Sequence, residues 1–380
     1  IHIEHPGEVI YYGLGEPLDV DGNPVSDVVY RIKDPSGNIV AGPLPVPLSG
    51  AGYISTYIEA INGPDGIIGP SGYPALVYIP LMTGDYFIEF NFTTSGAAAH
   101  DRTKFRYFDI TVASAANQPI DGRVWSKAWQ CTADDNGFQY DFYGTFYVYS
   151  VDSIVTSIYG NGMAPYVFTI ACNQWGCFNT GNFANDRRSV AGKYIIPQYK
   201  IFLNNPDSLV YPTGIIGQIL PPIVVTPDCN TGQATIEITV TKIGFTDIVL
   251  NINPLPGIQA EDRVISGQVV YGQNTFVWDG LDGLGVPVPS GTVFDIEVTY
   301  VNGLTNLPFY DPDDNPNGYI INLHRPSGPL PKVFWDDHLV GGGQNLNGCI
   351  YTLPTTGCHP FLINIGNNNT LNTWWYAATH

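Results

Sequence analysis

Basic residues are scarce in this chain of 380 residues, which has 15 Lys and Arg against 34 Asp and Glu. The formal net charge is −19, and the sequence pI is near 4.4. Nucleic acids and anionic membrane surfaces both favour partners with clustered Lys and Arg. The composition therefore argues against either one as a partner.

Long apolar runs and helical periodicity are missing as well. No stretch approaches the about 18 uncharged apolar residues that span a membrane. Apolar and polar residues instead alternate along residues 88–92, 235–241 and 294–300, which is typical of strands with one buried face. The 42 Gly and 31 Pro suit short turns, and 44% hydrophobic residues suffice for packed cores. The sequence predicts an all-β protein of tandem antiparallel β-sandwich domains.

Composition changes along the chain suggest four domains. A stretch of small residues and proline at 113–119 is typical of a linker, and Pro221-Pro222 marks a second boundary. The chain stops at His380 within a hydrophobic run, so we expect the natural polypeptide to continue. The expected domains are a β-sandwich at 1–113, an aromatic-rich β domain at 114–222, a compact domain at 223–303 and a β domain at 304–380.

Common catalytic motifs are absent: the sequence contains no G-x-S-x-G, no Gly-rich phosphate loop and no HExxH. Asp336 and Asp337, beside Trp335, could supply one carboxylate of a glycosidase, which needs two across a cleft. Adjacent residues on a strand point to opposite faces, so these two cannot be the pair by themselves. We therefore predict a protein without catalytic activity. A secreted polysaccharide-degrading enzyme is the main alternative.

No CxxC pair occurs, although the chain has six cysteines. An even number without metal-site spacing favours disulfides, an oxidising compartment and hence secretion. The first residue is Ile1 and not Met, and no basic-then-apolar leader follows it, which suggests a processed or excised chain. Six buried thiols are the alternative. The cysteines are Cys131, Cys172, Cys177, Cys229, Cys349 and Cys358, and the short loops make Cys172 with Cys177 and Cys349 with Cys358 the candidate pairs.

Oxygen ligands are concentrated in residues 311–318. Asp313, Asn315 and Asn317 stand at alternate positions, as in a calcium loop, with Gly318 at the position of the sharp turn. His324 stands where a bidentate acid is expected, so calcium would need Asp311, Asp314 and backbone carbonyls instead. The alternative is a polar turn between domains. Calcium is the only cofactor that the sequence suggests, with Asp311, Asp313, Asp314, Asn315 and Asn317 as candidate ligands.

Aromatic residues gather in the second and fourth domains. Trp125, Trp129, Trp374, Trp375 and the run at 140–149 suit either a core or a sugar-stacking platform. On a strand, Tyr147 and Tyr149 share one face and Phe146 and Val148 share the other. One face is therefore expected in the core, and the other is available to a glycan or a neighbouring domain.

The segment Trp278-Asp279-Gly280-Leu281-Asp282-Gly283, which continues through Pro289-Ser290-Gly291, resembles the turn of FlgD-like immunoglobulin modules. The resemblance implies an immunoglobulin-like fold for residues 223–303, with Trp278 anchoring a strand end in the core. In that family an aromatic residue follows the Ser-Gly-Thr almost at once, whereas Val293 precedes Phe294 here. The motif carries no implication about chemistry.

A second resemblance is carried by five segments: Gly122-Arg123-Val124-Trp125-Ser126-Lys127, residues 142–149, Asn179-Thr180-Gly181-Asn182, Val333-Phe334-Trp335-Asp336-Asp337 and residues 369–376. These segments resemble very large surface proteins of Bacteroidota, including gliding-motility adhesins exported by type IX secretion. The resemblance implies an outer-membrane secretion or motility machinery as partner. Asp152-Ser153-Ile154 and Asp207-Ser208-Leu209 match that phylum's O-glycosylation pattern, so Ser153 and Ser208 are candidate sites.

These observations predict a non-catalytic, secreted cell-surface adhesin segment that binds a glycan or a solid surface and acts as a rigid spacer. A carbohydrate-binding module alone and a subunit that polymerises through strand edges are further alternatives. The long loops rich in Gly and Asn argue mildly against flat, self-pairing edges.

Overall fold

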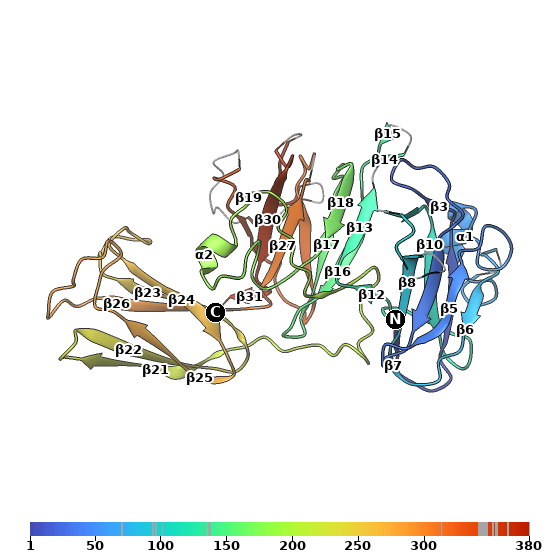
Figure 1. Ribbon diagram of the computed structural model, residues 1–380. Helices are drawn as coiled ribbons and strands as arrows, with labels where there is room; N and C mark the ends of the chain where they lie inside the picture. The colour runs from blue at the N-terminus through green and yellow to red at the C-terminus, as the bar shows by residue number, and fades with distance from the viewer. Residues whose placement is uncertain are drawn as a thin grey trace. The chain divides into compact units, whose positions relative to one another are not determined.

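The computed structural model describes residues 1–380 except 70, 93, 94, 96, 101, 133, 136, 137, 313, 341–348, 352, 354, 355, 363, 364 and 380. The described chain is nearly all β, with many antiparallel sheets, which confirms the predicted fold class (Figure 1). It forms two compact units. The structure thus divides the chain differently from the four expected domains.

The first unit consists of Ile1–Ser126, Asp135–Phe138 and Phe202–Pro212. Its two main sheets have the strand orders β11-β10-β2-β6 and β5-β4-β8, and two-stranded pairs join β1 with β7 and β3 with β9. The elements are β1 (His2–Ile3), β2 (Val9–Leu14), β3 (Pro17–Leu18), β4 (Val29–Lys33), β5 (Ile39–Pro45), α1 (Tyr57–Asn62), β6 (Leu76–Tyr78), β7 (Gly84–Asp85), β8 (Phe87–Phe92), β9 (Lys104–Phe105), β10 (Phe108–Ala113), β11 (Pro119–Ile120) and β12 (Trp125–Ser126).

A buried ion pair closes this first unit. Arg123 is 2% exposed and Glu8 is 3% exposed, and two guanidinium nitrogens of Arg123 donate to the two carboxylate oxygens of Glu8 at 3.1 and 3.3 Å. Nε of Arg123 donates to Asp207 at 2.6 Å. Arg123 thus connects the segment 202–212, through Asp207, to Glu8 near the N-terminus. Removing one of these charged groups would leave its partner buried and unpaired, which is costly.

The second unit contains a central module built from two distant segments. Its sheets have the orders β20-β16-β17-β28 and β19-β30-β27, with β29 also on β30 and β13 pairing with β18. The elements are β13 (Trp129–Thr132), β14 (Asp134–Asp135), β15 (Phe138–Gln139), β16 (Thr145–Tyr149), β17 (Val155–Tyr159), β18 (Val167–Ile170), α2 (Phe183–Asp186), β19 (Val190–Ala191), β20 (Lys200–Phe202), β27 (Thr305–Tyr310), β28 (Ile320–Arg325), β29 (Val333–Trp335) and β30 (Asn369–Trp375).

One hydrophobic core runs through both segments of the central module. Phe146, Val148 and Ile158 from the first segment pack in the same cluster as Phe309 and Trp375 from the second. The ranges 114–222 and 304–380 both contribute residues to this one core. The burial of Phe146 and Val148 confirms that this face of the tyrosine-rich strand lies in the core.

The immunoglobulin-like module lies between these two segments in sequence. One sheet has the order β21-β22-β25 and the other the order β24-β23-β26-β31 (Figure 1). Ile236, Ile238, Ile248, Leu250 and Tyr300 form its core between the two layers. The strands are β21 (Ile219–Asp228), β22 (Gln233–Val240), β23 (Gly244–Asn251), β24 (Arg263–Val269), β25 (Gly272–Trp278), β26 (Asp295–Asn302) and β31 (Ala378–Thr379).

The tryptophan motif of this module takes the role that the resemblance implied. Trp278 ends β25, packs against the core, and donates from Nε1 to the carbonyl of Leu281 at 2.7 Å. Its ring meets Phe294 edge-on, with centroids 5.5 Å apart. Val293 is 95% exposed, so the extra residue points to solvent and Phe294 keeps its place against the core.

Candidate functional site

The immunoglobulin-like module joins the central module through very short connections. Only Gly303 and Leu304 separate β26 from β27, and β30 leads back through Tyr376 and Ala377 to β31, which pairs with β26. Gly303 has φ 64°, and a Cβ there would lie 2.4 Å from that of Ala377. Only glycine fits this crossing, and the chain has little freedom to bend there.

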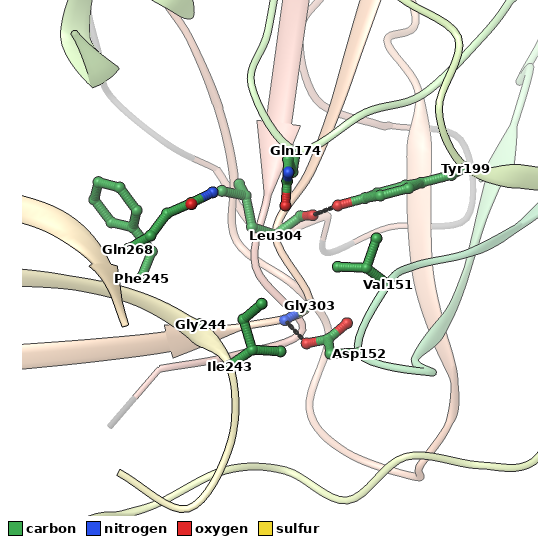
Figure 2. Close-up of a pocket in the computed structure, with 10 residues that line it drawn as sticks. All are labelled: Val151, Asp152, Gln174, Tyr199, Ile243, Gly244, Phe245, Gln268, Gly303 and Leu304. Atoms are coloured by element: carbon green, nitrogen blue, oxygen red, sulfur yellow. Dashed lines mark hydrogen bonds between the residues drawn. The ribbon is translucent and has the colours of Figure 1, made fainter. Parts of the chain in front are cut away.

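Hydrogen bonds from both modules meet at Asp152, which is 8% exposed (Figure 2). One carboxylate oxygen accepts from the Gly303 amide at 2.7 Å, and the other accepts from the Ser150 hydroxyl. The Asp152 carbonyl accepts from Lys242 Nζ at 3.2 Å. The Tyr199 hydroxyl donates to the Leu304 carbonyl at 2.8 Å. The turn before β17 is therefore fastened to both the crossing and the neighbouring module.

A buried arginine makes a second set of contacts between the central module and the immunoglobulin-like module. Arg187 follows α2, is 1% exposed, and lies among the rings of Phe183, Phe245, Trp374 and Tyr376. One of its nitrogens donates to the Tyr376 hydroxyl at 2.8 Å, while Nε and Nη2 find no hydrogen-bond partner among the described residues. Burial lowers its pKa to about 10, so it stays charged at neutral pH. Cation–π contacts offset part of the cost of burying this charge.

A pocket lies at the same joint (Figure 2), with an empty volume of about 350 Å³ that includes open solvent. Val151, Ile243 and Leu304 give it an apolar wall, while Gln174 and Gln268 add amide groups. Both oxygens of its carboxylate, Asp152, already accept hydrogen bonds from the protein. The Asp152 carboxylate therefore has a structural role in the joint, and we do not assign a binding site to the pocket beside it.

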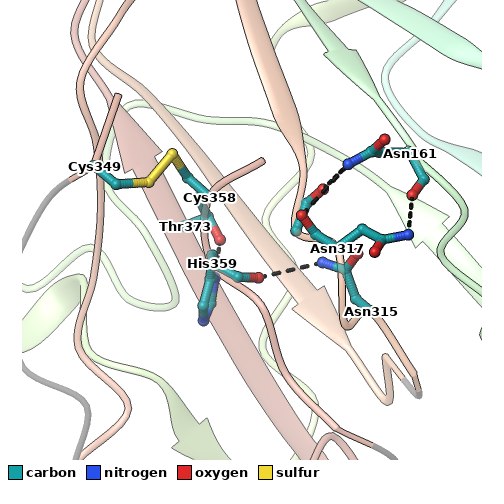
Figure 3. Close-up of a disulfide and its surroundings, with 8 residues drawn as sticks. Asn161, Asn315, Asn317, Cys349, Cys358, His359 and Thr373 are labelled. Carbon is teal, nitrogen blue, oxygen red and sulfur yellow. Dashed lines mark hydrogen bonds between the residues drawn. A yellow bond between two sulfur atoms is a disulfide. The ribbon is translucent and has the colours of Figure 1, made fainter. Parts of the chain in front are cut away.

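A chain of contacts between buried polar side chains links Ser189 to Thr373 of β30 through Asp337 and His359 (Figure 3 shows its His359 end). The Ser189 hydroxyl donates to Asp337 at 2.5 Å, and the other Asp337 oxygen lies 2.8 Å from Nε2 of His359. Nδ1 of His359 contacts the Thr373 hydroxyl. Burial raises the pKa of Asp337, but the charge and hydrogen bond of His359 and the Ser189 bond outweigh it, so the net shift is downward.

The order hydroxyl, imidazole, carboxylate is that of a hydrolytic triad. Thr373 is 1% exposed and His359 is 0% exposed, however, and Trp335 stacks on the imidazole with centroids 5.1 Å apart. A substrate in solution cannot reach either group. We therefore assign this chain of contacts a structural role: it holds His359, whose φ is 57°, in a left-handed backbone.

Asp336 and Asp337 have different partners, as expected, although both follow β29 and do not lie on it. Asp336 contacts His338 and Arg188, whereas Asp337 faces Ser189 and His359. Each carboxylate has its own partners, so the two do not act as one pair.

The candidate calcium ligands are drawn into other contacts (Figure 3). Nδ2 of Asn317 donates to the Asn161 carbonyl at 3.1 Å, and Nδ2 of the fully buried Asn315 donates to the His359 carbonyl at 3.2 Å. Asp311 accepts from the Asn368 amide, and the Asp314 carbonyl accepts from the Ala164 amide.

The remaining candidate ligand, Asp313, lies outside the described residues. Among the residues that are described, no group of three or more His, Cys, Asp or Glu could hold a metal ion. The contacts of Asn315 and Asn317 use their amide nitrogens, and calcium stays a prediction.

Of the two candidate disulfides, the structure contains Cys349–Cys358, with Cα atoms 5.9 Å apart (Figure 3). Cys172 and Cys177 are free and buried, so the prediction of a disulfide between them is wrong. The side chain of Asn173 accepts from the amides of Trp175 and Gly176 and fixes the loop. Cys172 thereby packs into the core, where burial raises its pKa, and burial likewise raises the pKa of Cys177 to about 12.

Reduction of Cys349–Cys358 is expected to destabilise the central module. The disulfide closes a loop with a sequence separation of 9, for which chain entropy gives about 2–3 kcal/mol. Thermal unfolding with and without a thiol reductant measures this, and a Cys349→Ser variant should lose the reductant effect. An identical midpoint under both conditions for the unaltered protein would contradict the assignment.

Each candidate glycosylation triplet uses its aspartate in the fold. Asp152 fastens the joint, and Asp207 binds Arg123 and accepts from the Leu209 amide. Ser208 is exposed, whereas Ser153 is half-buried with φ 65°. Turn formation accounts for both triplets, and modification of these serines stays a prediction.

The outer face of β16, β17 and β28 carries a row of aromatic rings. Tyr143 is 57% exposed, and its ring lies 6.4 Å from that of Tyr159. Farther along, Tyr147 lies 5.1 Å from His324, which also contacts the Ser157 hydroxyl at 2.8 Å. Trp374 and Trp375 are buried in the central module instead, as expected for core tryptophans. On this outer face the tyrosines supply exposed rings, whereas Trp374 and Trp375 do not.

Sequence reasoning did not predict the roles of Arg187 and His359. Arg187 stands next to Arg188, and nothing in that pair distinguishes a buried cation from an exposed one. His359 follows Cys358, and the candidate disulfide was the only available signal that this loop is fixed.

Comparisons with protein families, with curated proteins and with solved structures found no match for this chain. Within the part that the structure describes, neither helix has the length or the apolar character needed to cross a bilayer.

Proposed function

We propose that this chain is a non-catalytic segment of a secreted, extracellular cell-surface adhesin that binds a glycan or solid surface and acts as a rigid spacer. The joint at Gly303 carries this proposal. A two-residue crossing, a returning strand and the buried Asp152 and Arg187 contacts leave the two modules of the second unit little freedom. Rigidity of this kind suits a protein that must hold a binding surface at a fixed distance.

Other observations support the same proposal. A disulfide favours an oxidising compartment, and the charge of −19 would keep a long exposed protein soluble. The motif resemblance to Bacteroidota adhesins extends the proposal to type IX secretion and gliding motility.

The aromatic row is the best candidate for the binding surface, which keeps a carbohydrate-binding module as the second candidate function. Exposed tyrosine rings can stack on the apolar faces of sugars. Asp141 accepts from the Tyr143 hydroxyl and supplies a polar group beside the ring.

Retention on immobilised polysaccharides tests this proposal. We expect the protein to be retained without releasing reducing sugar, and Tyr143→Ala to weaken retention, because about 1 kcal/mol or more is lost with one aromatic stacking contact. Tyr271→Ala, on the immunoglobulin-like module and 80% exposed, is the matched control. Release of reducing sugar would favour the alternative of a polysaccharide-degrading enzyme. Equal retention of both variants would show that the aromatic row is not the binding surface.

A further inference from the structure

The most exposed ring of the aromatic row stands beside a carboxylate. Tyr143 is 57% exposed, and its hydroxyl donates to Oδ2 of the exposed Asp141 at 3.2 Å. This hydrogen bond raises the pKa of Tyr143, so the hydroxyl keeps its proton and directs it at Asp141. A ligand on the ring therefore meets lone pairs of the hydroxyl and of the carboxylate, which favour a ligand that supplies hydrogen-bond donors.

A tight loop fixes this end of the row. Gly162 has φ 84°, and a Cβ there would lie 3.1 Å from the Tyr143 hydroxyl and 3.3 Å from Nδ2 of Asn317. Nδ2 of Asn317 in turn donates to the carbonyl of Asn161 at 3.1 Å. The Tyr143 hydroxyl thus lies over the loop between β17 and β18, beside the turn of residues 311–318.

The two segments that build this end contain no basic residue. Lys and Arg are absent from residues 128–186, which include β16 and β17, and from residues 264–324, which include the turn. Asp141 therefore places its negative charge beside the Tyr143 ring without a basic residue in either segment to neutralise it.

The other end of the row differs in charge. Arg325 ends β28 and pairs with Val155, four residues along β17 from Tyr159, which corresponds to about 13 Å. Burial and the charge of Arg325 lower the pKa of His324, so its ring stays uncharged down to a lower pH than an ordinary histidine. The Tyr143 end is therefore the part of the row that attracts a cation.

We propose that the Tyr143 end of the aromatic row binds the free amino group of a polysaccharide built from amino sugars. The sugar ring stacks on Tyr143, and its ammonium group donates a charge-assisted hydrogen bond to the Asp141 carboxylate. An acidic polysaccharide would bring a second negative charge to the same place and is disfavoured. This inference rests on the proposed function, since it names the ligand class of the same binding surface.

Two ligands with one sugar backbone test the inference. The first is a short glucosamine oligosaccharide with free amines, and the second is its fully N-acetylated form, which is uncharged. In slightly acidic buffer, which keeps the amines protonated, we expect the full chain to bind the first at least about tenfold more tightly, the ratio that one charge-assisted hydrogen bond supplies. Calorimetry measures both affinities.

Two matched variants locate the contribution of the carboxylate. Asp141→Asn keeps the shape of the side chain but removes its charge. It should weaken binding of the free amine by about tenfold or more, and binding of the N-acetylated form by less than about twofold. Asp295→Asn makes the same charge change at an exposed position of the immunoglobulin-like module and should alter neither affinity.

The outcomes separate this inference from the proposed function. Equal affinity for the two ligands, weakened alike by Tyr143→Ala, would overturn the amino-sugar inference and leave the aromatic row as a binding surface. Equal weakening by Asp141→Asn and Asp295→Asn would trace binding to the net charge of −19 and would overturn it as well. Binding of neither ligand would also overturn it, and retention on other polysaccharides would then decide the proposed function separately.

Discussion

Asp337→Ala is expected to destabilise the central module by about 3–5 kcal/mol, the cost of leaving one member of a buried pair alone. Asp337 is 3% exposed, and its removal leaves His359 and Ser189 buried without their hydrogen-bond partner. Chemical denaturation followed by tryptophan fluorescence measures the loss. Asp295→Ala, at an exposed position, is the control and should change stability by less than about 0.5 kcal/mol.

The stability lost in Asp337→Ala is also expected to depend on pH. The pKa of Asp337 is lowered in the folded protein, against the opposing effect of burial, mainly by the charge of His359. Its contribution to stability is therefore present above the unfolded pKa, about 3.9, and is lost as pH falls through the lower folded pKa. The stability difference between the two proteins should shrink below about pH 4. A difference that persists unchanged into strong acid would contradict the pairing.

Arg123→Met is expected to cost the first unit about 3–5 kcal/mol. The substitution keeps an unbranched side chain but leaves Glu8 buried without its guanidinium partner. Arg263→Met removes a half-exposed pair with Asp279 and should cost less than about 1 kcal/mol.

A double variant separates the pair from its surroundings. Adding Glu8→Leu to Arg123→Met should recover part of the loss, because the buried charge is gone. Additive losses in unfolding experiments would instead show that the two side chains act independently.

The strand pattern was predictable where one face is buried. Alternation around Phe146 and Val148 correctly indicated that one face of this strand lies in the core, and the short loop of Cys349 and Cys358 correctly indicated a disulfide. Such signals are local, since they depend on neighbours along the chain. The loop in which Cys172 and Cys177 stay free is fixed by the side-chain contacts of Asn173, which spacing alone does not reveal.

The assembly of the central module was not predictable in the same way. β27 and β30 are buried along almost their whole length, and the sequence does not show that they pack against strands that precede the immunoglobulin-like module in the chain. Pairs such as Asp337 with His359, or Arg187 with Phe245, arise only after the strand order is fixed. The joint between the two modules, on which the proposed function depends, likewise forms only once the strand order is fixed.

The distance distribution between the two modules of the second unit tests the rigid-spacer account most directly. A spin label on the exposed thiol of Cys229 and a second at Lys332→Cys, also exposed, can be measured by pulsed electron resonance. The account predicts one narrow distribution, which broadens when Asp152→Ala removes the bond to Gly303. A broad distribution in the protein with Asp152 intact would contradict it.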